Sequence, residues 1–492
     1  MTEDAGKAGD AGVWFFSTLD DVGLTENRIT IVWDPSAPTT INNRIELDAW
    51  MPQATLSAVQ VIFAVVPARA RDLTSTPDAP AKYAAFCALL AKTYPQVTQI
   101  VIGNEPNQPR FWQPQFGPDG RGVSATAYQK VLARSYDELK AVNPKISVIG
   151  VGLSPRGNDN PRAKDNVSIS PVKFLRDLGA AYRASGRTKP LMDELAFHPY
   201  PRQNIDSPAT GYRWPNVGLP NFGRLKQAFW DAFHGTPQPT FPETASARAA
   251  PKPVKLALDE LGWEVAIPSS LVPLYHGLET KQPIDETTQA RYYRDTVRMV
   301  VCDHDVRSFS FFHLMDEYDL ERWQSGLLRA DRSKRPSYGS VKQVIHDTQG
   351  KCAGKLATWK HTTTVIEAQA KFTDAKRRQS AGKRKWWFAV KAGEDVLYRA
   401  GLFRVQGAKA TGRERSAIAR TLAGRRGAKA ALSTRGPLKH ALKKTVRFAR
   451  RGVRSGYYVY AVRMTAAMNP TRAKIFFSRP IQVGTPSRRS RR

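Results

Sequence analysis

The chain has 492 residues, 41% of them hydrophobic, and carries a formal net charge of +32. This length and apolar content suffice for more than one hydrophobic core and suggest roughly two to four domains. Since no apolar run reaches the roughly 18 residues of a transmembrane helix, we expect no membrane span. Residues 1–12 are polar and small, without the basic and then apolar pattern of a signal peptide, and we expect them to form a flexible leader.

The positive charge is concentrated in the C-terminal part of the chain. Residues 351–492 contain 36 Lys and Arg but only 5 Asp and Glu, whereas residues 1–350 are nearly neutral. Such a sharp shift in composition marks a domain boundary. We therefore predict a first domain at 13–350, a basic second domain at 351–484 and a disordered, Arg-rich tail at 485–492.

Short apolar runs alternate with longer amphipathic segments from residue 28 onward. The runs are rich in Val, Ile and Leu, as strands buried on both faces tend to be. They occupy residues 28–33, 59–66, 97–102, 146–151, 191–197, 254–258 and 306–312. Helical patterns lie between them, and this regular alternation predicts a parallel α/β sheet with crossover helices. Seven strands are one short of a (β/α)8, or TIM, barrel, which we predict for residues 13–350.

The strand that is missing from this count should be the first, and two alternatives are open. Either the first strand precedes Met1, together with a signal peptide, or the apolar stretch GVWFF at residues 12–16 forms a short first strand. We favour the first alternative, because GVWFF is short and follows a polar leader.

From about residue 351 the pattern changes to short runs in which apolar and polar residues alternate. Examples are KWWFAVKAG from Lys385 and GYYVYAVRMTA from Gly456. A period of two with turn residues between the runs predicts an antiparallel β-sandwich. Residues 456–483 resemble the closing strands of an immunoglobulin-like accessory domain on a secreted protein.

Polar, titratable and aromatic residues follow four of the predicted strands. In a parallel barrel, functional side chains lie where the strands end. These residues are Asn104 and Glu105, His198 and Tyr200, Asp259, Glu260 and Trp263, and His313, Asp316 and Glu317. One such strand end is ordinary turn chemistry, but four that share a rim indicate a functional site.

Glu105 and Glu260 are the natural pair of reacting carboxylates at this rim. Cleavage of a glycosidic bond needs one protonated carboxyl group, which donates to the leaving oxygen. It also needs one ionised carboxylate, which attacks the anomeric carbon or activates water. We prefer Glu260 over its neighbour Asp259, because a glycine follows Glu260 by two residues.

This pattern resembles the clan A glycoside hydrolases, the retaining (β/α)8 enzymes that include families 5 and 39. In that clan the acid/base is the Glu of an Asn-Glu pair ending strand 4, and the nucleophile is a Glu ending strand 7. If the missing strand is the first, these positions are Asn104-Glu105-Pro106 and Glu260-Leu261-Gly262. The resemblance implies that Glu105 is the acid/base and Glu260 the nucleophile. The implied reaction is hydrolysis of a β-linked poly- or oligosaccharide through a covalent glycosyl-enzyme.

The resemblance also implies contacts with the substrate. The implied substrate-binding residues are Asn104, His198, Tyr200, Trp263 and Trp323. Asn104 would hydrogen-bond the sugar 2-hydroxyl, His198 and Tyr200 match a His and a Tyr near the nucleophile, and the two tryptophans would stack on sugar rings. The sequence departs from family 5 at Val101, where a polar residue is usual. The strand ending at Trp33 also lacks the Arg that often follows strand 2.

The three cysteines, at positions 87, 302 and 352, fit no zinc motif. We expect no metal and no cofactor. Cys302 and Cys352 flank one predicted strand-helix unit, so they can meet at one end of it. A disulfide there would require an oxidising compartment.

The basic residues 351–492 predict an anionic partner. Lys and Arg interleaved with Trp386 and Trp387 suit nucleic acid, but no RRM, KH or helix-turn-helix signature is present. We favour an anionic cell-wall polymer or acidic polysaccharide and an extracellular or wall-associated protein, with a structural, Arg-rich sandwich as the alternative. The alternative to an enzyme is a non-catalytic carbohydrate- or polyanion-binding surface protein.

Overall fold

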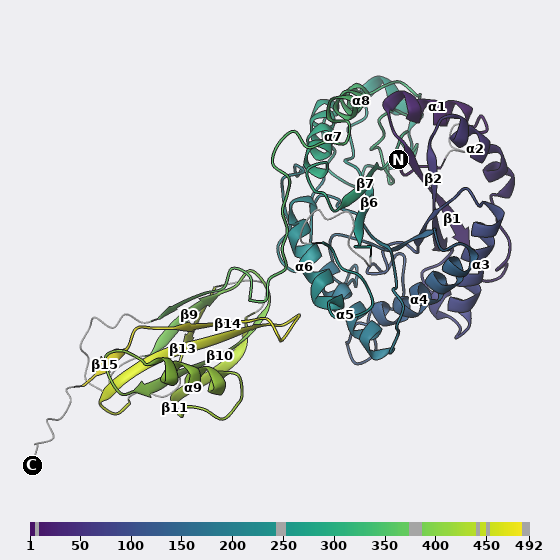
Figure 1. The fold of residues 1–492 in the computed structure, drawn as a ribbon. Helices are drawn as coiled ribbons and strands as arrows, with labels where there is room; N and C mark the ends of the chain where they lie inside the picture. The colour runs from purple at the N-terminus through teal and green to yellow at the C-terminus, as the bar shows by residue number, and fades with distance from the viewer. Residues whose placement is uncertain (5–8, 243–251, 373–385, 439–442, 449–452, 485–492) are drawn as a thin grey trace, which may run out of the picture. The chain divides into compact units, whose positions relative to one another are not determined.

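The computed structural model describes residues 1–4, 9–242, 252–372, 386–438, 443–448 and 453–484. The chain forms two compact units (Figure 1). The first comprises Met1–Tyr212 and Asn216–Lys360, and the second comprises Arg213–Pro215 and His361–Arg492. The change of fold therefore falls shortly after the change in composition at residue 350.

A curled sheet of seven parallel strands lies at the centre of the first unit (Figure 1). Each strand pairs with its neighbours in chain order. The strands are β1 (Glu26–Trp33), β2 (Gln60–Pro67), β3 (Gln99–Ile102), β4 (Ser147–Leu153), β5 (Glu194–Phe197), β6 (Lys255–Leu261) and β7 (Val306–Phe311). Each overlaps an apolar run that the sequence marks as a strand, so the predicted parallel, TIM-barrel-like α/β fold is confirmed.

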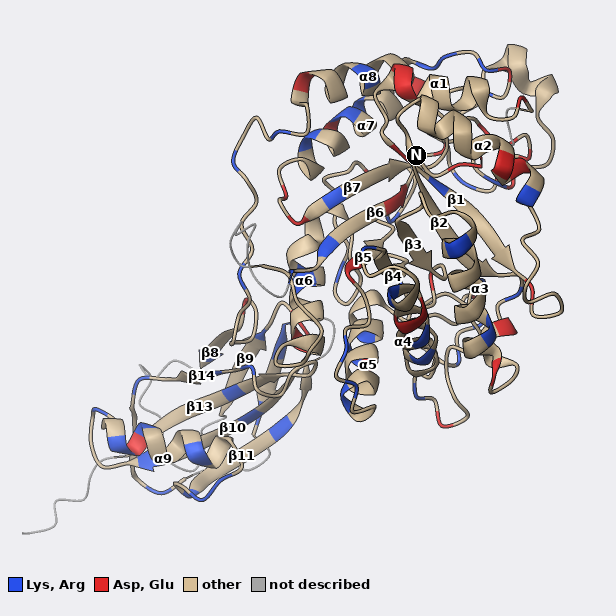
Figure 2. Cartoon of the chain, turned by 45° about the vertical axis from the view of Figure 1, so that its right-hand side comes forward, with Lys and Arg blue, Asp and Glu red and all other residues tan. Residues whose placement is uncertain are grey.

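Helices alternate with the strands and cover the outside of the sheet (Figure 2). They are α1 (Val13–Val22), α2 (Arg44–Leu56), α3 (Ala79–Thr93), α4 (Ser124–Val142), α5 (Pro171–Ala184), α6 (Phe222–Phe233), α7 (Glu286–Val300) and α8 (Pro336–Thr348). Short 3-10 helices lie at Asp72–Thr74, Leu219–Asn221 and Ser269–Leu274. Ser170 and Asp285 begin α5 and α7, because their side chains accept hydrogen bonds from backbone N–H groups of the first turn. Among the described residues, no helix has the length and apolar character needed to cross a membrane.

Small and branched apolar side chains fill the interior of the curled sheet. One buried cluster draws on the five strands from β2 to β6. Its members are Ile62, Ala64, Val101, Ile149, Ala196 and Ala257. Val101 is fully buried in this layer. An apolar residue therefore suits the position at which the sequence departs from family 5.

Residues 1–4 lie between the two edge strands of the sheet, β1 and β7. The backbone N–H of Thr2 donates to the carbonyl oxygen of Phe311 in β7 (2.9 Å). On the other side, the N–H of Arg28 in β1 donates to the carbonyl oxygen of Met1 (2.8 Å). Thr2 pairs with Arg28 in the parallel sense, as a neighbouring strand would. With this segment in first place, β3 and β6 occupy the fourth and seventh places around the sheet.

The structure differs from the predicted leader at residues 1–4 and from the less favoured alternative for the first strand. Met1, Thr2 and Glu3 are buried, whereas we expected residues 1–12 to be a flexible leader. The stretch GVWFF contributes to α1 and is not a strand. Phe16 and Leu19 lie three residues apart and are both fully buried. The apolar residues here therefore follow the helical period.

Two antiparallel sheets form the second unit, as the alternating runs predict. The larger contains β10 (Val396–Val405), β11 (Ala430–Leu438), β13 (Gly456–Ala466), β14 (Ala473–Phe477) and β15 (Ile481–Val483), and the smaller contains β8 (Gln369–Phe372), β9 (Trp387–Lys391) and β12 (Lys444–Arg447). One buried cluster joins side chains of both sheets, among them Phe388 of β9 and Tyr460 of β13. The helix α9 (Gly412–Leu422) packs on the opposite face of the larger sheet.

A disulfide joins Cys302 to Cys352. Cys302 lies just after α7 and Cys352 just after α8, so the bond ties together the ends of two neighbouring helices. Cys87 is free and buried in α3. The two cysteines that flank one strand-helix unit thus meet at one end of it, as the sequence allows.

Removal of this disulfide should destabilise the first unit. The bond joins residues 50 apart in the chain, and by the chain-entropy account a closed loop of this size stabilises the folded state by about 4 kcal/mol. We expect the double variant Cys302→Ser/Cys352→Ser to lose several kcal/mol of unfolding free energy in urea titrations. The same loss should follow treatment of the wild type with a reductant. An unchanged unfolding free energy in both experiments would contradict this role.

Candidate active site

Side chains from four strands meet at the carboxyl ends of β3, β5 and β6. They come from these strand ends and from β1, which is far away in the sequence. The predicted residues that the structure brings together are Asn104, Glu105, His198, Tyr200 and Glu260. The contacts among them are short and mostly buried. The strand-end reasoning therefore located one cluster rather than separate turns.

The imidazole of His198 lies between the two predicted reacting carboxylates. Its Nδ1 is 3.0 Å from Glu105 Oε1 and 3.4 Å from Glu260 Oε2. The opposite nitrogen, Nε2, is 3.2 Å from Asp259 Oδ1. The side chain of His198 is fully buried, whereas those of Glu105 and Glu260 are 13% and 11% exposed. The two carboxylates thus share one partner, and each keeps some access to solvent.

Arg28 is a central residue of the site that the sequence analysis did not identify. Its Nη1 is 3.0 Å from Glu260 Oε1, and its Nε is 3.1 Å from Asp259 Oδ2. Its Nη2 donates a hydrogen bond to Asn104 Oδ1 (2.9 Å). We sought a basic residue after the strand that ends at Trp33, but the cation lies within that strand. The sequence does contain a signal for this residue. Arg28 is a lone arginine at the start of an apolar run, so its charge has to be buried and needs a partner.

An irregularity in β6 lets two successive carboxylates contact the same arginine. Successive side chains of a regular strand point to opposite faces. The pairing of β6 with β7 shifts register between Leu258 and Leu261. Such bulges redirect side chains, and both Asp259 and Glu260 reach Arg28. Asp259, the competitor of Glu260 in the sequence analysis, is the more buried of the two.

Two glycines allow the backbone to come close to the reacting residues. A Cβ on Gly262 would lie 2.4 Å from the carbonyl oxygen of Phe312, so the Glu-Leu-Gly motif needs its glycine where β6 meets β7. Gly152 in β4 adopts a φ of +56°, and a Cβ there would lie 3.3 Å from His198 Nε2. The carbonyl oxygen of Gly152 accepts a hydrogen bond from the N–H of Glu105 (3.0 Å).

Glu105 is held in a backbone conformation that residues other than glycine rarely adopt. Its φ is +36°, in the left-handed direction. Its carbonyl oxygen accepts a hydrogen bond from the N–H of Gln108 (2.8 Å). The next turn is anchored by Asn107, which is fully buried and donates to the carbonyl oxygen of Ser154 (3.2 Å). Strained residues of this kind persist where their surroundings hold them, and they cluster at functional sites.

Burial and charge act in opposite directions on the titration of His198. Burial alone would lower the pKa of His198, but the nearby carboxylates raise it to about 10. The largest of these contributions come from Glu260 and Asp259, and a hydrogen bond to Glu105 adds to them. Burial would raise the pKa of Asp259, but the charges of His198 and Arg28 hold it below its ordinary value. The site therefore contains an imidazolium at neutral pH.

Tyr200 and Trp323 form the aromatic part of the site. Burial and the nearby carboxylates, first that of Glu260, raise the pKa of Tyr200 well above its ordinary value. Its hydroxyl therefore stays protonated and donates to Glu260 Oε2 (3.2 Å). The Trp323 ring lies 4.8 Å from that of Tyr200, and the ammonium of Lys281 lies 3.8 Å from the centre of the Trp323 ring. This grouping extends the site onto the loop after β7.

Trp263, the second tryptophan predicted to stack on a sugar, is buried in the core of the first unit. It is only 1% exposed, and its indole N–H donates to the carbonyl oxygen of Asp206 (2.9 Å). Its ring packs against those of Tyr292 and Tyr293, at centroid distances of 5.4 and 5.8 Å. This placement argues against contact with a sugar ring.

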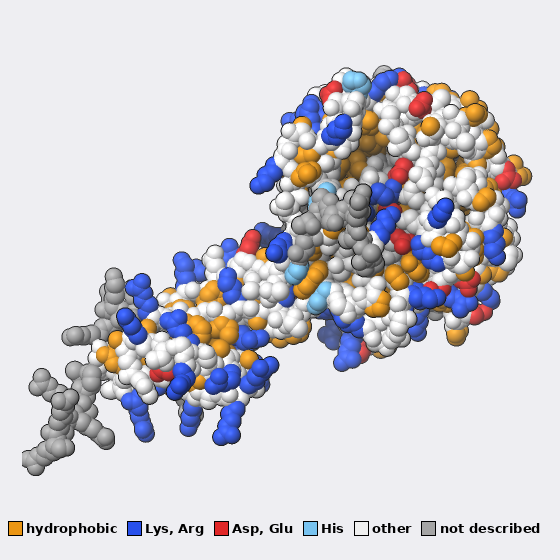
Figure 3. Space-filling model, in the orientation of Figure 1, with side chains coloured by type: hydrophobic (Ala, Val, Ile, Leu, Met, Phe, Trp, Pro, Cys, Tyr) orange, Lys and Arg blue, Asp and Glu red, His pale blue; other side chains and the backbone are white. Residues whose placement is uncertain are grey.

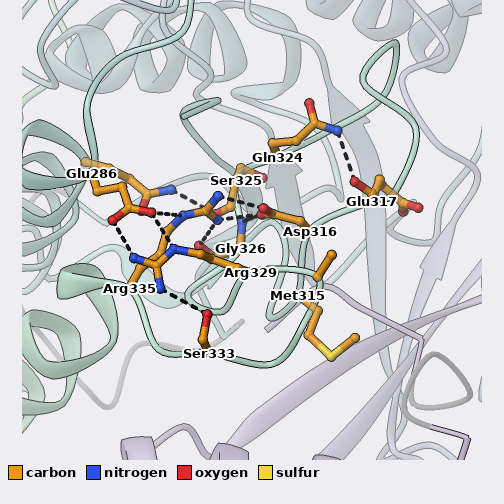
Figure 4. A network of polar contacts seen from close by, with 12 residues as sticks. Glu286, Met315, Asp316, Glu317, Gln324, Ser325, Gly326, Arg329, Ser333 and Arg335 are labelled. Carbon is orange, nitrogen blue, oxygen red and sulfur yellow. Dashed lines mark hydrogen bonds and ion pairs between the residues drawn. The ribbon is translucent and has the colours of Figure 1, made fainter. Parts of the chain in front are cut away.

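A buried network of arginines and carboxylates holds the loop after β7 (Figure 4). Arg335 binds both oxygens of Asp316, at 2.5 and 2.6 Å, and neither side chain is exposed. Glu286 joins Arg335 to Arg329. Asp316 therefore has a structural role at the rim, and the network fixes the loop that carries Trp323.

Two groups in the described residues combine His with carboxylates at distances that could suit a metal. In the group of Asp303, His304 and Asp305, the ammonium of Lys226 lies 2.6 Å from each aspartate and supplies the positive charge. The other group, whose members are Glu3, His313 and Glu317, lies near the start of the chain. There the Nδ1 of His313 is within hydrogen-bond distance of a backbone carbonyl oxygen (3.0 Å). Because Nδ1 donates to a carbonyl, it has no lone pair for a metal, and only Nε2 of His313 could serve as a ligand.

No protein-family model and no curated protein matches this chain. Solved structures with a similar fold include a monomeric beta-xylosidase from Caulobacter crescentus CB15, at 13% identity and a TM-score of 0.44, covering 92% of this chain and 93% of that one. A glucosidase from Croceicoccus marinus has 14% identity and a TM-score of 0.45, covering 88% of each chain. A beta-glucuronidase from Bacteroides uniformis has 9% identity and a TM-score of 0.41 over 96% of this chain, which spans only 43% of that protein. These neighbours are glycosidases by name, and similarity this weak carries no argument about the activity here.

His198 should make the stability of the protein depend on pH in the alkaline range. Its pKa is about 10 in the folded protein, against about 6.5 in an unfolded chain. The stabilisation by the imidazolium is complete below about pH 6.5 and is lost as the pH rises from there through about 10. We expect the difference in unfolding free energy between wild type and His198→Gln to shrink by at least about 1 kcal/mol over that range, since one pKa unit corresponds to about 1.4 kcal/mol. Urea titrations across this range measure it, and parallel pH profiles of the two proteins would disprove it.

Proposed function

We propose that the first unit is a retaining glycoside hydrolase that cleaves a β-linked poly- or oligosaccharide, with Glu260 as nucleophile and Glu105 as acid/base. One observation carries this proposal. The two carboxylates stand at the ends of β3 and β6, and both lie within 3.4 Å of the same nitrogen of His198. A carboxylate pair that flanks one point is what double displacement at an anomeric carbon requires.

The separation of the two carboxylates is compatible with retention. Because their oxygens lie 3.0 and 3.4 Å from one nitrogen, they are no farther apart than the sum of these distances. That limit concerns the oxygens nearest His198 and reaches the lower edge of the roughly 6.5–9.5 Å found in inverting enzymes, which need room for a water molecule between the carboxylates. It is compatible with the separation of about 5–5.5 Å that is typical of retaining enzymes.

The surroundings of the carboxylates favour Glu105 as the group that exchanges the proton. Asp259 and Glu260 are each in contact with the guanidinium of Arg28. Glu260 accepts from Arg28 and from the hydroxyl of Tyr200, as a nucleophilic carboxylate should. Glu105 has the most exposed side chain of the three carboxylates, at 13%. It is therefore the best placed to exchange a proton with substrate and water.

The reaction then follows in two steps. Glu105 gives its proton to the glycosidic oxygen as that bond to the anomeric carbon breaks, and an oxygen of Glu260 forms a bond to the same carbon. In the second step the Glu105 carboxylate takes a proton from water. The water oxygen bonds to the anomeric carbon and releases Glu260, so both glutamates return to their starting states.

Asn104 and Trp323 are proposed to position the sugar. Arg28 donates to Asn104 Oδ1, which leaves the NH2 group of that amide to donate to a sugar 2-hydroxyl. Trp323 lies beside Tyr200 and so brings an aromatic surface next to the nucleophile. The apolar face of a pyranose suits contact with such a ring.

We also propose that the protein works outside the cell or at the cell wall. The disulfide between Cys302 and Cys352 supports this location, because such bonds persist in oxidising compartments. The second unit is proposed to be an immunoglobulin-like accessory sandwich. Its two antiparallel sheets share one hydrophobic core, as the sheets of a sandwich do.

The roles of the two glutamates are separable by azide rescue on aryl β-glycosides. Glu260→Ala should lose at least about a thousandfold in kcat. Azide can then take the place of the nucleophile and yield a glycosyl azide of inverted configuration. Glu105→Ala should lose about 10²–10⁴-fold, and azide should intercept its glycosyl-enzyme to yield the azide of retained configuration. NMR spectroscopy of the products distinguishes the two anomers.

Asp34→Asn is the matched control, because Asp34 follows the end of β1 and its carboxylate contacts the neighbouring Ser36. We expect this variant to turn over like the wild type. Turnover at the wild-type rate in either Glu105→Ala or Glu260→Ala would exclude the role proposed for that residue. Binding of oligosaccharides without turnover by the wild type would favour the alternative, a non-catalytic carbohydrate-binding protein.

A further inference from the structure

The larger sheet of the second unit has one face in the core and one face turned away from it. In β10, Tyr398 and Leu402 belong to the core that both sheets share. Phe403 and Val405 lie on the opposite face, where α9 covers them. Because side chains alternate along a strand, Arg399 is on the same face as Phe403. It lies beyond the covered part and is exposed.

Three arginines stand directly opposite one another on this outer face. Arg399 of β10 pairs with Arg435 of β11 on one side and with Arg463 of β13 on the other. We call these three residues the arginine row. Arg399 and Arg435 are exposed and Arg463 is partly exposed. Since neighbouring strands lie about 4.8 Å apart, the row places three positive charges at short, regular intervals.

The arginine row has no negative counterpart in the described part of the second unit. The ion pair described there, between Arg472 and Glu394, is buried in the core. Glu414 is engaged at the start of α9, where it forms a capping box with Thr411. Like charges directly opposite on neighbouring strands destabilise a sheet. The fold therefore maintains a cluster of charge that it does not neutralise.

Basic residues extend this surface beyond the row (Figure 2). The guanidinium of Arg399 lies against Gly424, where a Cβ would be 2.7 Å from its Nη1. Gly424 follows the end of α9, and the partial negative charge of a helix C-terminus helps to hold a cation. Arg425 and Arg426 come next and are exposed. Figure 3 shows Lys and Arg side chains projecting from this unit.

The aromatic side chains of the unit are poorly placed for nucleic acid. Proteins that bind single strands without sequence preference stack bases on exposed aromatic rings. In the second unit the rings of Trp386, Tyr398, Tyr458 and Tyr460 are buried. The rings of Trp387, Tyr457 and Phe477 are only partly exposed, and the last two pack beside α9. Among its described residues, the large apolar side chain that is most exposed is Leu397, two positions before Arg399 on the same face. Among the described residues of this unit, the surface thus offers charge and one exposed apolar contact, and no fully exposed aromatic ring.

We propose that the arginine row binds an acidic polysaccharide through the carboxylates of its uronic acid residues. A guanidinium presents two parallel N–H groups that match the two oxygens of a carboxylate. The two outer arginines are separated by two strand spacings, close to the length of two sugar residues, so an extended chain lying across the strands can bring alternate carboxylates to them. Leu397 supplies an apolar contact for a sugar ring. This binding is independent of any reaction in the first unit.

The full-length triple variant R399T/R435T/R463T tests the proposal. Threonine suits strands, and relief of the like-charge repulsion should leave the protein at least as stable as the wild type in thermal melts. The probe is a fluorescently labelled oligogalacturonate, followed by anisotropy at low salt. We expect the Kd to rise at least about tenfold, because three charge-assisted contacts are lost. No binding by the wild type, or an unchanged Kd in this variant, would overturn the proposal.

Two further variants separate the row from the general positive charge. K371T/K391T/R447T removes the same charge from exposed positions on the smaller sheet, and we expect its Kd to change less than about threefold, since distant charges are screened. R399K/R435K/R463K keeps the charge without the planar fork and should bind more weakly than the wild type. Equal losses in the two threonine variants, or an unchanged Kd in the lysine variant, would overturn the proposed contact. Tighter binding of a single-stranded oligonucleotide of equal charge would assign the surface to nucleic acid instead.

Discussion

Two buried cations, Arg28 and His198, hold three carboxylates together at the centre of the first unit. Moving an ion from water into a protein interior costs several kcal/mol, and the loss is recovered only by close, well-aligned partners. The Arg28 side chain is 3% exposed and that of His198 is fully buried, so neither can rely on water. The carboxylates at the ends of β3 and β6 and the cation in β1 thus depend on one another. The strands that carry them must keep their places for any member to remain charged.

The segment that closes the curled sheet also contacts the strand that carries two carboxylates of this cluster. Residues 1–4 join β1 to β7 through the backbone. The hydroxyl of Thr2 also donates to the carbonyl oxygen of Asp259 (2.5 Å). That residue lies in the irregular part of β6, where two successive carboxylates reach Arg28. The segment that bridges the edge strands therefore also fixes the backbone beside Glu260, which links the integrity of the sheet to the geometry of the site.

The sequence could predict what is encoded locally. Apolar runs mark the strands, and the polar residues after them mark the rim, so the sequence predicts that Glu105 and Glu260 lie at one rim, where the structure places them. Arg28 was missed because a cation inside a strand gains its meaning from partners on β3 and β6, which are distant in sequence. Residues 1–4 were missed because their place is set by the gap between β1 and β7 and not by apolar periodicity. The helix α9 was missed although its capping box, Thr411 with Glu414, is a local signal.

Arginines serve two opposite purposes in this chain, and their partners distinguish them. Arg335 binds both oxygens of Asp316 in the first unit, and Arg472 binds both oxygens of Glu394 in the second. These pairs are buried, and each ties a loop to a core. The arginine row differs in every respect, because it is on the surface, lies opposite like charges and has no described carboxylate partner. An arrangement that weakens the sheet and lacks a described carboxylate partner fits the proposed binding of an anion from outside the chain.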